Sequence, residues 1–579
     1  MNCGFNFVTS LHQFSTKQVI VMSAPDAPAR FANLVTALGG FLLSFVLAAC
    51  VGIHIPDGES ARSPAPRLDV RAINLSDPGS RLPAGWQHGA FMEIFVRGWR
   101  DSDGDGIGDL RGVTQSLDYL RDLGIKGIWL MPITKSADGD HGYAVTDFRD
   151  IEPAYGTLAD FDELLREAHA RGIGVIMDYV INHSAASHPL FVAAGSPTSP
   201  YRHWYLWKDR APIGWDIWGK NPWHSSPNGT FYGTFGAHMP DFNLENAAAM
   251  DYHRASLKFW LNRGIDGFRF DAVPHLVERS AKDWNDQPES YALMAHVNAL
   301  MAGYKNRHMV CEATANPTRW AAPYICGSAF AFGLEHKMID AARGKPEAIL
   351  AVSEYFNAAP LTMATMLSNH DIFAGERLWD QLKGDVAQYR LAAATYLLMP
   401  GTPFIYYGEE IGMGGVNSLV ADAKLRTPMS WNAQVVGTDA FTAGSAKPFR
   451  PVSDNAGTHN VKRALADPNS ILSFYKTMLR LRNTLPSIAR GDYSNAKVDG
   501  SVMSFQRRYE DERTMVAINY GTASATMDIA GLPAGAALDP VYPADVAGSI
   551  PVRSAGAKIT IDAQSVRVFR VSVASRTNY

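Results

Sequence analysis

The chain has 579 residues, enough for two or three domains with a large core. A hydrophobic content of 46% and a charged content of 19% are typical of a globular protein. The formal net charge of −4 gives no basic footprint for nucleic acid, so we expect no nucleic-acid partner. Four cysteines are too few for a disulfide scaffold. For Cys311 and Cys326, a bridge and two buried thiols are equally open interpretations.

The first 49 residues are predicted to be an export signal. Residues 34–49 are apolar or small except for Thr36 and Ser44, and Leu47-Ala-Ala-Cys50 follows. A short apolar region that ends in small residues is typical of a secretory signal. The ending resembles a bacterial lipoprotein cleavage site, which implies a lipid on Cys50 and an exported, lipid-anchored cell-envelope protein, on the periplasmic side of the outer membrane or at the cell surface. An uncleaved membrane anchor is the alternative, because the run approaches the ~18 residues of a membrane span.

From Phe91 onward, apolar strand-like runs alternate with amphipathic helical ones such as 158–171 and 250–263. Such alternation over ~400 residues predicts a parallel sheet of the α/β class, and eight units predict a (β/α)8 TIM barrel. An open doubly wound sheet is the alternative, although nothing resembles its Gly-rich phosphate turn. The expected strands are 91–96, 124–132, 172–180, 264–273, 308–313, 365–370 and 402–410, with a weaker one at 330–335.

One connection is unusually long, because roughly seventy residues separate the third strand from the next helix. This insertion holds five of the thirteen tryptophans, with further aromatic residues among them. Each ring alone is more typical of a core, but the group suggests a carbohydrate cleft, since aromatic faces stack on sugars. The five tryptophans are Trp204, Trp207, Trp215, Trp218 and Trp223.

After a helix at 471–485, short alternating segments separated by turns predict a C-terminal antiparallel β-sandwich domain. The segment before Trp86 is rich in Pro, Ser, Gly and charge, which favours a tether. The expected organisation is a signal peptide at 1–49, a tether at 50–86, a catalytic barrel at 87–182 and 244–489, an inserted domain B at 183–243 and an all-β domain at 490–579.

Charged side chains end several of the predicted strands. Arg269 and Asp271 lie two residues apart, so a strand presents both on one face. In a barrel of this kind the carboxyl ends of the strands carry the chemistry. Asp178 and Asn182, near the end of the third strand, are interpreted as groups that cap a loop. The candidate site residues at the four strand ends are His183, Arg269, Asp271, Glu312, His370 and Asp371.

Three converging carboxylates suit the cleavage of a glycosidic bond. One carboxylate attacks the anomeric carbon, and a second protonates the leaving oxygen. We expect crowded negative charge to raise the pKa of the acid, and Arg269 to keep Asp271 ionised.

The four strand-end segments resemble the four signature regions of glycoside hydrolase family 13, the α-amylase family, in the family's order. The resemblance covers the chain from about Phe91 to the C-terminus. It implies a retaining mechanism with Asp271 as nucleophile, Glu312 as general acid/base and Asp371 as transition-state stabiliser. The same resemblance implies three sugar ligands, which are His183, Arg269 and His370.

Three further segments refine this resemblance. Met239–Asn243 resembles the family's fifth region, in the form found between the oligo-glucosidase and neopullulanase branches. The segment with Asp140 and Tyr143 resembles one that holds the terminal glucose in exo-acting glucosidases, which implies that both residues bind substrate. Arg426 lies in a segment that resembles glucosidases and trehalose synthases, whose arginine pairs with that aspartate. Ala272, next to the predicted nucleophile, is the small residue that goes with α-1,4 linkages in the glucosidase branches.

The segment 101–109 has the first half of a calcium-binding loop, with alternating carboxylates and a glycine that permits a sharp turn. Its twelfth position is Gly112 rather than glutamate, so the loop is not an EF-hand. Hard oxygen ligands at this spacing favour Ca²⁺, whereas a solvated acidic turn would leave the charges uncompensated. The family resemblance implies a structural Ca²⁺ held by Asp101, Asp103, Asp105, the carbonyl of Ile107 and Asp109.

The sequence therefore predicts a retaining α-glycosidase, an α-amylase or α-glucosidase, whose substrate is an α-1,4-linked glucan or malto-oligosaccharide. A transglycosylase or isomerase such as a trehalose synthase is the alternative, because the same residues serve either reaction. A non-catalytic relative is a third reading, and the complete acid triad speaks against it. The sequence leaves the choice between endo and exo action and the oligomeric state open.

Overall fold

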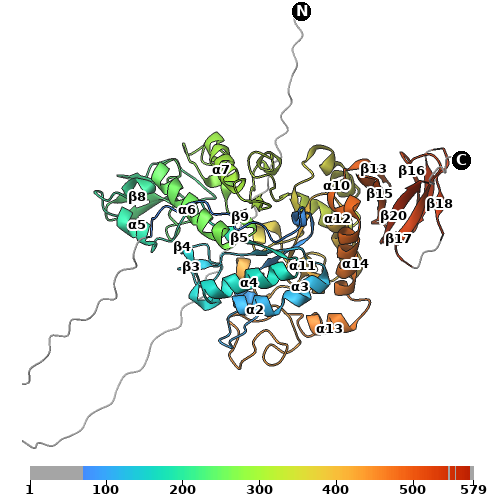
Figure 1. The fold of residues 1–579 in the computed structure, drawn as a ribbon, viewed down its shortest axis with the longest axis horizontal. Helices are drawn as coiled ribbons and strands as arrows, with labels where there is room; N and C mark the ends of the chain where they lie inside the picture. The colour runs from blue at the N-terminus through green and yellow to red at the C-terminus, as the bar shows by residue number, and fades with distance from the viewer. Residues whose placement is uncertain (1–68, 545–547, 555, 574–579) are drawn as a thin grey trace, which may run out of the picture. The chain divides into compact units, whose positions relative to one another are not determined.

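The computed structural model describes residues 69–544, 548–554 and 556–573 (Figure 1). The predicted signal peptide, Cys50 and the tether up to residue 68 lie outside the described residues. Within the described ranges, no helix combines the length and the apolar character that crossing a bilayer requires.

The central sheet is a barrel of parallel strands in the order β10-β9-β5-β2-β1-β12-β11. Two parallel bridges, Cys311 to Ala329 and Phe330 to Ala364, join its two edge strands through a short segment. This segment takes the place of the weak strand expected at 330–335, and it begins one residue earlier. The (β/α)8 prediction is thereby confirmed. The strands are β1 (Phe91–Ile94), β2 (Gly127–Leu130), β5 (Gly174–Tyr179), β9 (Gly267–Phe270), β10 (His308–Cys311), β11 (Ala364–Thr365) and β12 (Thr402–Tyr406).

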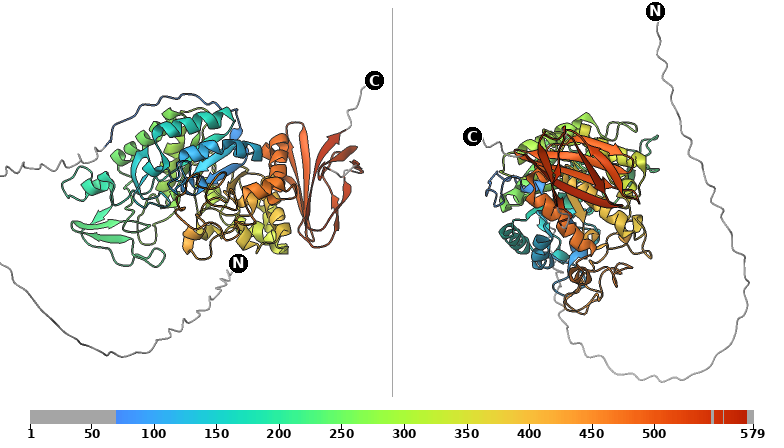
Figure 2. Two further views of the ribbon diagram at one scale, coloured as in Figure 1. Left: turned by 90° about the horizontal axis from the view of Figure 1, so that it is seen from below. Right: turned by 90° about the vertical axis from the view of Figure 1, so that its right-hand side faces the viewer.

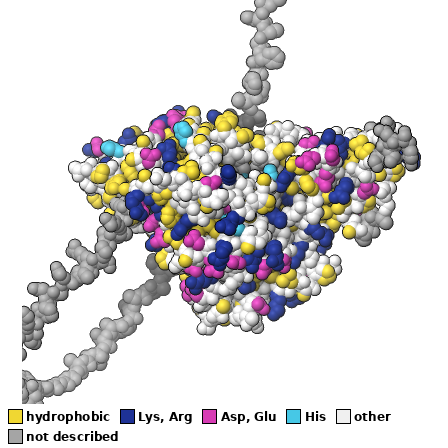
Figure 3. Space-filling view, viewed as in Figure 1, with side chains coloured by type: hydrophobic (Ala, Val, Ile, Leu, Met, Phe, Trp, Pro, Cys, Tyr) yellow, Lys and Arg dark blue, Asp and Glu magenta, His cyan; other side chains and the backbone are white. Residues whose placement is uncertain are grey.

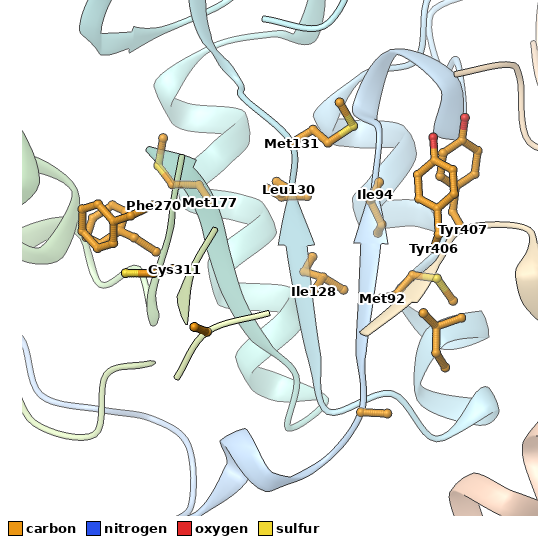
Figure 4. Packing of buried hydrophobic residues seen from close by; sticks show 14 of the residues in the cluster. Met92, Ile94, Ile128, Leu130, Met131, Met177, Phe270, Cys311, Tyr406 and Tyr407 are labelled. Atoms are coloured by element: carbon orange, nitrogen blue, oxygen red, sulfur yellow. The ribbon is translucent and has the colours of Figure 1, made fainter. Parts of the chain in front are cut away.

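The barrel strands are buried on both faces, as their continuous apolar sequences indicate. Large aromatic rings fill the interior, where Phe91 stacks on Phe404 with ring centroids 4.7 Å apart. Alternate residues form a second layer, and Figure 4 shows Met92 on β1 beside Ile128 on β2. Gly267 lets β9 approach β10, because a Cβ there would lie 1.8 Å from the carbonyl oxygen of His308.

The helices surround the barrel (Figure 2). The helices expected at 158–171 and 250–263 are present as α4 (Leu158–Ala170) and α6 (Ala247–Arg263). A capping box formed by Thr157 and Asp160 begins α4. Gly264, with φ 102°, ends α6 and turns the chain into β9. The other helices around the barrel are α1 (Val96–Trp99), α2 (Leu110–Gln115), α3 (Leu117–Leu123), α7 (Pro288–Met301), α8 (Pro317–Trp320), α9 (Leu334–Ala342), α10 (Pro346–Ala358), α11 (Leu378–Gln381), α12 (Val386–Leu398), α13 (Val461–Ala466), α14 (Ile471–Thr484) and α15 (Pro486–Arg490).

The insertion after β5 forms a small sheet in the order β6-β8-β7, next to α5 (Pro189–Ala194). An antiparallel bridge between His183 and Asp241 joins the two ends of the insertion. It therefore leaves and re-enters the barrel at one point, beside the carboxyl end of β5. Its strands are β6 (Trp207–Lys208), β7 (Trp223–Ser226) and β8 (Gly229–Tyr232).

The C-terminal part is an antiparallel sheet in the order β13-β14-β15-β20-β17-β18, with the pair β16-β19 beside it. This arrangement confirms the predicted all-β sandwich. Figure 3 shows basic and acidic side chains interspersed over the face in view. The strands are β13 (Ser494–Asp499), β14 (Val502–Tyr509), β15 (Glu512–Asn519), β16 (Ala525–Ile529), β17 (Ala536–Tyr542), β18 (Ile550–Pro551), β19 (Ala557–Ile561) and β20 (Ser565–Val573).

Candidate active site

A cavity of about 540 Å³ is lined by residues that follow the carboxyl ends of the barrel strands and by residues of the insertion. Side chains expected at the site from four distant segments therefore share one space. The lining residues are His141, Tyr143, His183, Trp218, Phe235, Met239, Asp271, Ala272, Pro274, His275, Glu312, Thr314, Asp371, Phe373, Asp422 and Arg426.

Arg269 is the residue that links the two predicted acids. Its side chain is 1% exposed, and its Nη1 atom lies 2.6 Å from Oδ1 of Asp271. Its Nη2 atom lies 2.9 Å from Oε2 of Glu312. The backbone N–H of Ala272 also donates to Glu312, at 2.9 Å. One buried guanidinium therefore holds both carboxyl groups at the same cavity.

Burial changes the proton affinity of both acids. It raises the pKa of Glu312 to about 7, with Asp271 and Asp371 adding to the rise and Arg269 opposing it. The same effect raises the pKa of Asp271 to about 6, despite Arg269. Arg269 lowers the pKa of Asp271 against this rise, and a carboxyl with a pKa of about 6 is mostly ionised at neutral pH. The expectation that Arg269 keeps Asp271 ionised therefore stays a prediction.

His370 lies between two carboxylates. Its Nδ1 atom is 2.5 Å from Glu93 on β1, and its Nε2 atom is 3.0 Å from Asp371. Arg426 contacts the other oxygen of Asp371 at 2.7 Å. Although burial opposes it, His370 and Arg426 hold the pKa of Asp371 well below its usual range. Asp371 is therefore a permanent anion in the cavity wall.

Tyr143 and Asp178 form a hydrogen-bonded pair that contacts the guanidinium of Arg269. Tyr143 lies between β3 (Thr134–Ser136) and β4 (Val145–Ile151), and its hydroxyl donates to Asp178 at 2.9 Å. Asp178 and Arg269 are paired in register on β5 and β9, and their side chains lie 2.9 Å apart. Our interpretation of Asp178 as a loop cap is wrong, because its carboxylate compensates the charge of the arginine.

His183 presents a free ring nitrogen to the cavity region. It is buried, and its Nε2 atom has no partner within the described protein. Burial lowers its pKa to about 3, so the ring is neutral at physiological pH. The Nδ1 atom of the ring is paired with the Asn182 side chain at 3.4 Å, so the unpaired Nε2 atom suits a hydrogen bond to a ligand hydroxyl.

Asp140 does not line the cavity. Its carboxylate lies 2.8 Å from Arg450 and 3.9 Å from Arg426, so the expected contact with Arg426 is long. The backbone carbonyl of Arg426 also accepts a hydrogen bond from Arg450 at 3.0 Å. Arg450 therefore ties the two predicted ligands together, a role that its irregular segment gives no pattern to predict.

The acidic loop before α2 brings three carboxylates together. Ligand oxygens of Asp101, Asp103 and Asp109 lie within 4.8 Å of one another. Asp105 is not part of this group, and its carboxylate instead accepts the N–H of Ile107 at 2.7 Å. Three hard oxygen donors at this spacing fit a Ca²⁺ ion, with Asp105 and the Ile107 carbonyl on the same turn.

Cys311 and Cys326 form a disulfide, which decides between the two interpretations left open by the sequence. The bond connects the residue before Glu312 to the loop that leads into the bridging segment at 329–330. The disulfide therefore restrains the end of β10, directly before the predicted acid Glu312.

The barrel and its cavity, with paired carboxyl groups around an arginine, define an enzyme that acts on glycosidic bonds. The family model for the alpha-amylase catalytic domain matches residues 93–491. The chain thus belongs to the alpha-amylase family, glycoside hydrolase family 13.

Relatives within this family carry several activities in their names. Alpha-amylase 3 of Dictyoglomus thermophilum is 34% identical over 460 residues, which cover 76% of this chain and 87% of that protein. Trehalose synthase/amylase TreS of Mycolicibacterium smegmatis is 33% identical over 468 residues, covering 70% and 78%. The crystal structure of the alpha-amylase from H. orenii is 32% identical with a TM-score of 0.73, and the match covers 84% of this chain and all of that one, 100%.

Proposed function

We propose that this protein is a retaining α-glycosidase that hydrolyses α-1,4-linked glucans or malto-oligosaccharides. The observation that carries the proposal is the shared contact of Arg269 with Asp271 and Glu312. Near neutral pH, a pKa of about 6 suits Asp271 as the ionised nucleophile, and a pKa of about 7 suits Glu312 as the proton donor.

In the proposed mechanism, ionised Asp271 attacks the anomeric carbon while protonated Glu312 gives its proton to the leaving oxygen. Anionic Asp371 stabilises positive charge on the sugar ring. Water then attacks the glycosyl ester, and Glu312 removes the proton from that water. His183, Tyr143, His370 and Arg426 are proposed to bind the sugar hydroxyls, and Asp140 acts with Arg426.

A transglycosylase or isomerase is the second candidate, because relatives named as trehalose synthases are as similar as those named as glucosidases. The two candidates differ in whether water or a sugar hydroxyl receives the glycosyl group. Product analysis on maltotriose, isomaltotriose and maltose, with resolution of anomers, separates them. We expect α-anomeric glucose or maltose from maltotriose. Formation of trehalose from maltose would identify the protein as an isomerase instead of a hydrolase. No turnover of any of the three substrates would refute both candidate functions.

We propose that the acidic loop binds a structural Ca²⁺ through Asp101, Asp103, Asp105, Ile107 and Asp109. The support is the close group of three carboxylates, because Ca²⁺ prefers hard oxygen ligands of this kind. Chelation is expected to lower the melting temperature and added Ca²⁺ to restore it. Asp103→Asn should weaken this restoration, whereas Asp122→Asn on α3 should not. A melting temperature that changes neither with chelator nor with added Ca²⁺ would refute the site.

We also propose export and a lipid anchor at Cys50. The support is the lipoprotein-like ending of the leader, together with a disulfide in the barrel, since such bonds persist in oxidising compartments. Labelling with a radioactive fatty acid in a bacterial host is expected to mark the wild-type chain and not Cys50→Ala. Equal labelling of both chains, or of neither, would refute the anchor.

A further inference from the structure

A tight hairpin turn in the insertion carries Trp218 at its tip. Backbone hydrogen bonds of 2.8 and 3.0 Å join Ile217 and Lys220 in both directions, so only Trp218 and Gly219 lie between them. Their φ angles are both positive, 50° and 82°. A turn of this kind normally has Asn, Asp or Gly at its first central position. A tryptophan there is a backbone outlier, because its side chain crowds the left-handed conformation.

Three aromatic neighbours fix the direction of the indole ring. The centroid of Trp218 lies 5.6 Å from that of His275 and 5.6 Å from that of Trp284, nearly perpendicular to both. The ring centroid of Phe235, another residue of the insertion, lies 5.9 Å from that of Trp218. His275 and Trp284 stack on each other with an angle of 6° between their planes. The indole is therefore held in one orientation while Trp218 remains 63% exposed.

The aromatic residues and the acids share one cavity. Trp218, Phe235 and His275 line it together with Asp271 and Glu312. Asp371 and Arg426 contact each other and also line the cavity, and the proposed mechanism assigns them to the sugar that is attacked. With that sugar bound there, the aromatic residues are left for the sugar beyond the scissile bond. Aromatic faces suit that neighbour, because they stack on the apolar faces of sugar rings without a fixed hydrogen-bond pattern.

We propose that Trp218 is the platform for the sugar on the leaving-group side of the scissile bond, and that it sets the preference for oligosaccharides over substrates with small leaving groups. This inference rests on the proposed glycosidase function. A strained backbone with an exposed, oriented indole is costly for folding alone, and binding of a sugar face explains both features.

The experiment compares maltotriose with α-glucosyl fluoride, whose leaving group is too small to reach the indole. Trp218→Asn removes the ring and places a residue that the turn favours, so the melting temperature should not fall. We expect its kcat/KM on maltotriose to fall about tenfold more than on the fluoride. Trp218→Phe should recover most of the loss. Ile213→Ala, at a 95% exposed position of the insertion outside the cavity lining, should keep wild-type rates on both substrates.

Equal losses on the two substrates, or no loss on maltotriose, would overturn the role of Trp218. A wild-type enzyme that releases no fluoride would instead refute the proposed glycosidase function. The two failures are therefore distinguishable.

Discussion

The Nδ1 atom of His370 lies 2.5 Å from a carboxylate oxygen of Glu93, and both side chains are buried. Burial alone would lower the pKa of His370, but Asp371 and Glu93 raise it to about 10. The ring is therefore a cation that faces Glu93 on one side and Asp371 and Tyr143 on the other. Glu93 acts through His370 as a positioning residue for Asp371.

Glu93→Gln should weaken the hold on the His370 proton. Because the pKa of His370 lies above its ordinary value of 6.5, its contribution to stability is complete below pH 6.5 and is lost as the pH rises through about 10. The melting temperature of the variant should therefore be lower than that of the wild type near neutral pH and nearly equal to it above pH 10. Its kcat should be lower at every pH. Glu410→Gln is the control, since Glu410 is a buried partner of Tyr119 outside the cavity. An equal loss of melting temperature at every pH would contradict this role.

Asp271→Asn should abolish turnover without unfolding the protein. The amide cannot form the glycosyl ester, so we expect kcat on maltotriose to fall by about 10³-fold or more. The melting temperature should stay near that of the wild type, because the amide oxygen can still accept from Arg269. Asp528→Asn, on the exposed side of β16, serves as the control. Activity within about tenfold of the wild type would remove Asp271 from the mechanism.

The pH profile of kcat/KM should be bell-shaped. Its acid limb should lie near pH 6, where Asp271 loses its proton, and its alkaline limb near pH 7, where Glu312 loses its proton. Both groups titrate together, so the limbs describe the pair. Glu312→Gln should remove the alkaline limb, and should lower kcat/KM for maltotriose more than for α-glucosyl fluoride, whose leaving group needs no proton. An equal fall of kcat/KM for both substrates would argue against Glu312 as the acid.

Loss of the disulfide should destabilise the barrel. The bond closes a loop with a sequence separation of 15 residues. A loop of this length corresponds to about 3 kcal/mol of unfolding free energy. We expect the double variant Cys311→Ala/Cys326→Ala to lose about 2–3 kcal/mol in denaturant titration. Reducing agent should shift the wild type toward the variant and leave the variant unchanged. Equal stability of the two chains would contradict the prediction.

The sequence predicted the barrel and the residues at its strand ends because both rest on local signals. Asp271 lies in the expected strand 264–273 and Glu312 in the expected strand 308–313, and Asp371 directly follows the expected strand 365–370. The strand expected at 330–335 has only a weak sequence signal, because in the structure two bridges, at Ala329 and Phe330, are all that form it.

The supporting residues carried no comparable signal. Glu93 lies inside β1, and its partner His370 follows β11, so their contact exists only once the barrel is formed. Arg450 and Trp218 lie in irregular segments whose positions depend on tertiary packing. Asp178 was misread because its partner Arg269 is on the neighbouring strand and no local pattern reveals that register.

The shared contact with Arg269 has a consequence for the second half of the proposed reaction. The charge of Asp271 is one of the influences that raise the pKa of Glu312. When Asp271 becomes a glycosyl ester, that negative charge disappears while Arg269 remains beside the glutamate. The pKa of Glu312 then falls, so Glu312 loses its proton more readily. As an ionised carboxylate it can act as the base that accepts a proton from water. In the proposed reaction, Glu312 thus alternates between proton donor and proton acceptor according to whether Asp271 carries the glycosyl group.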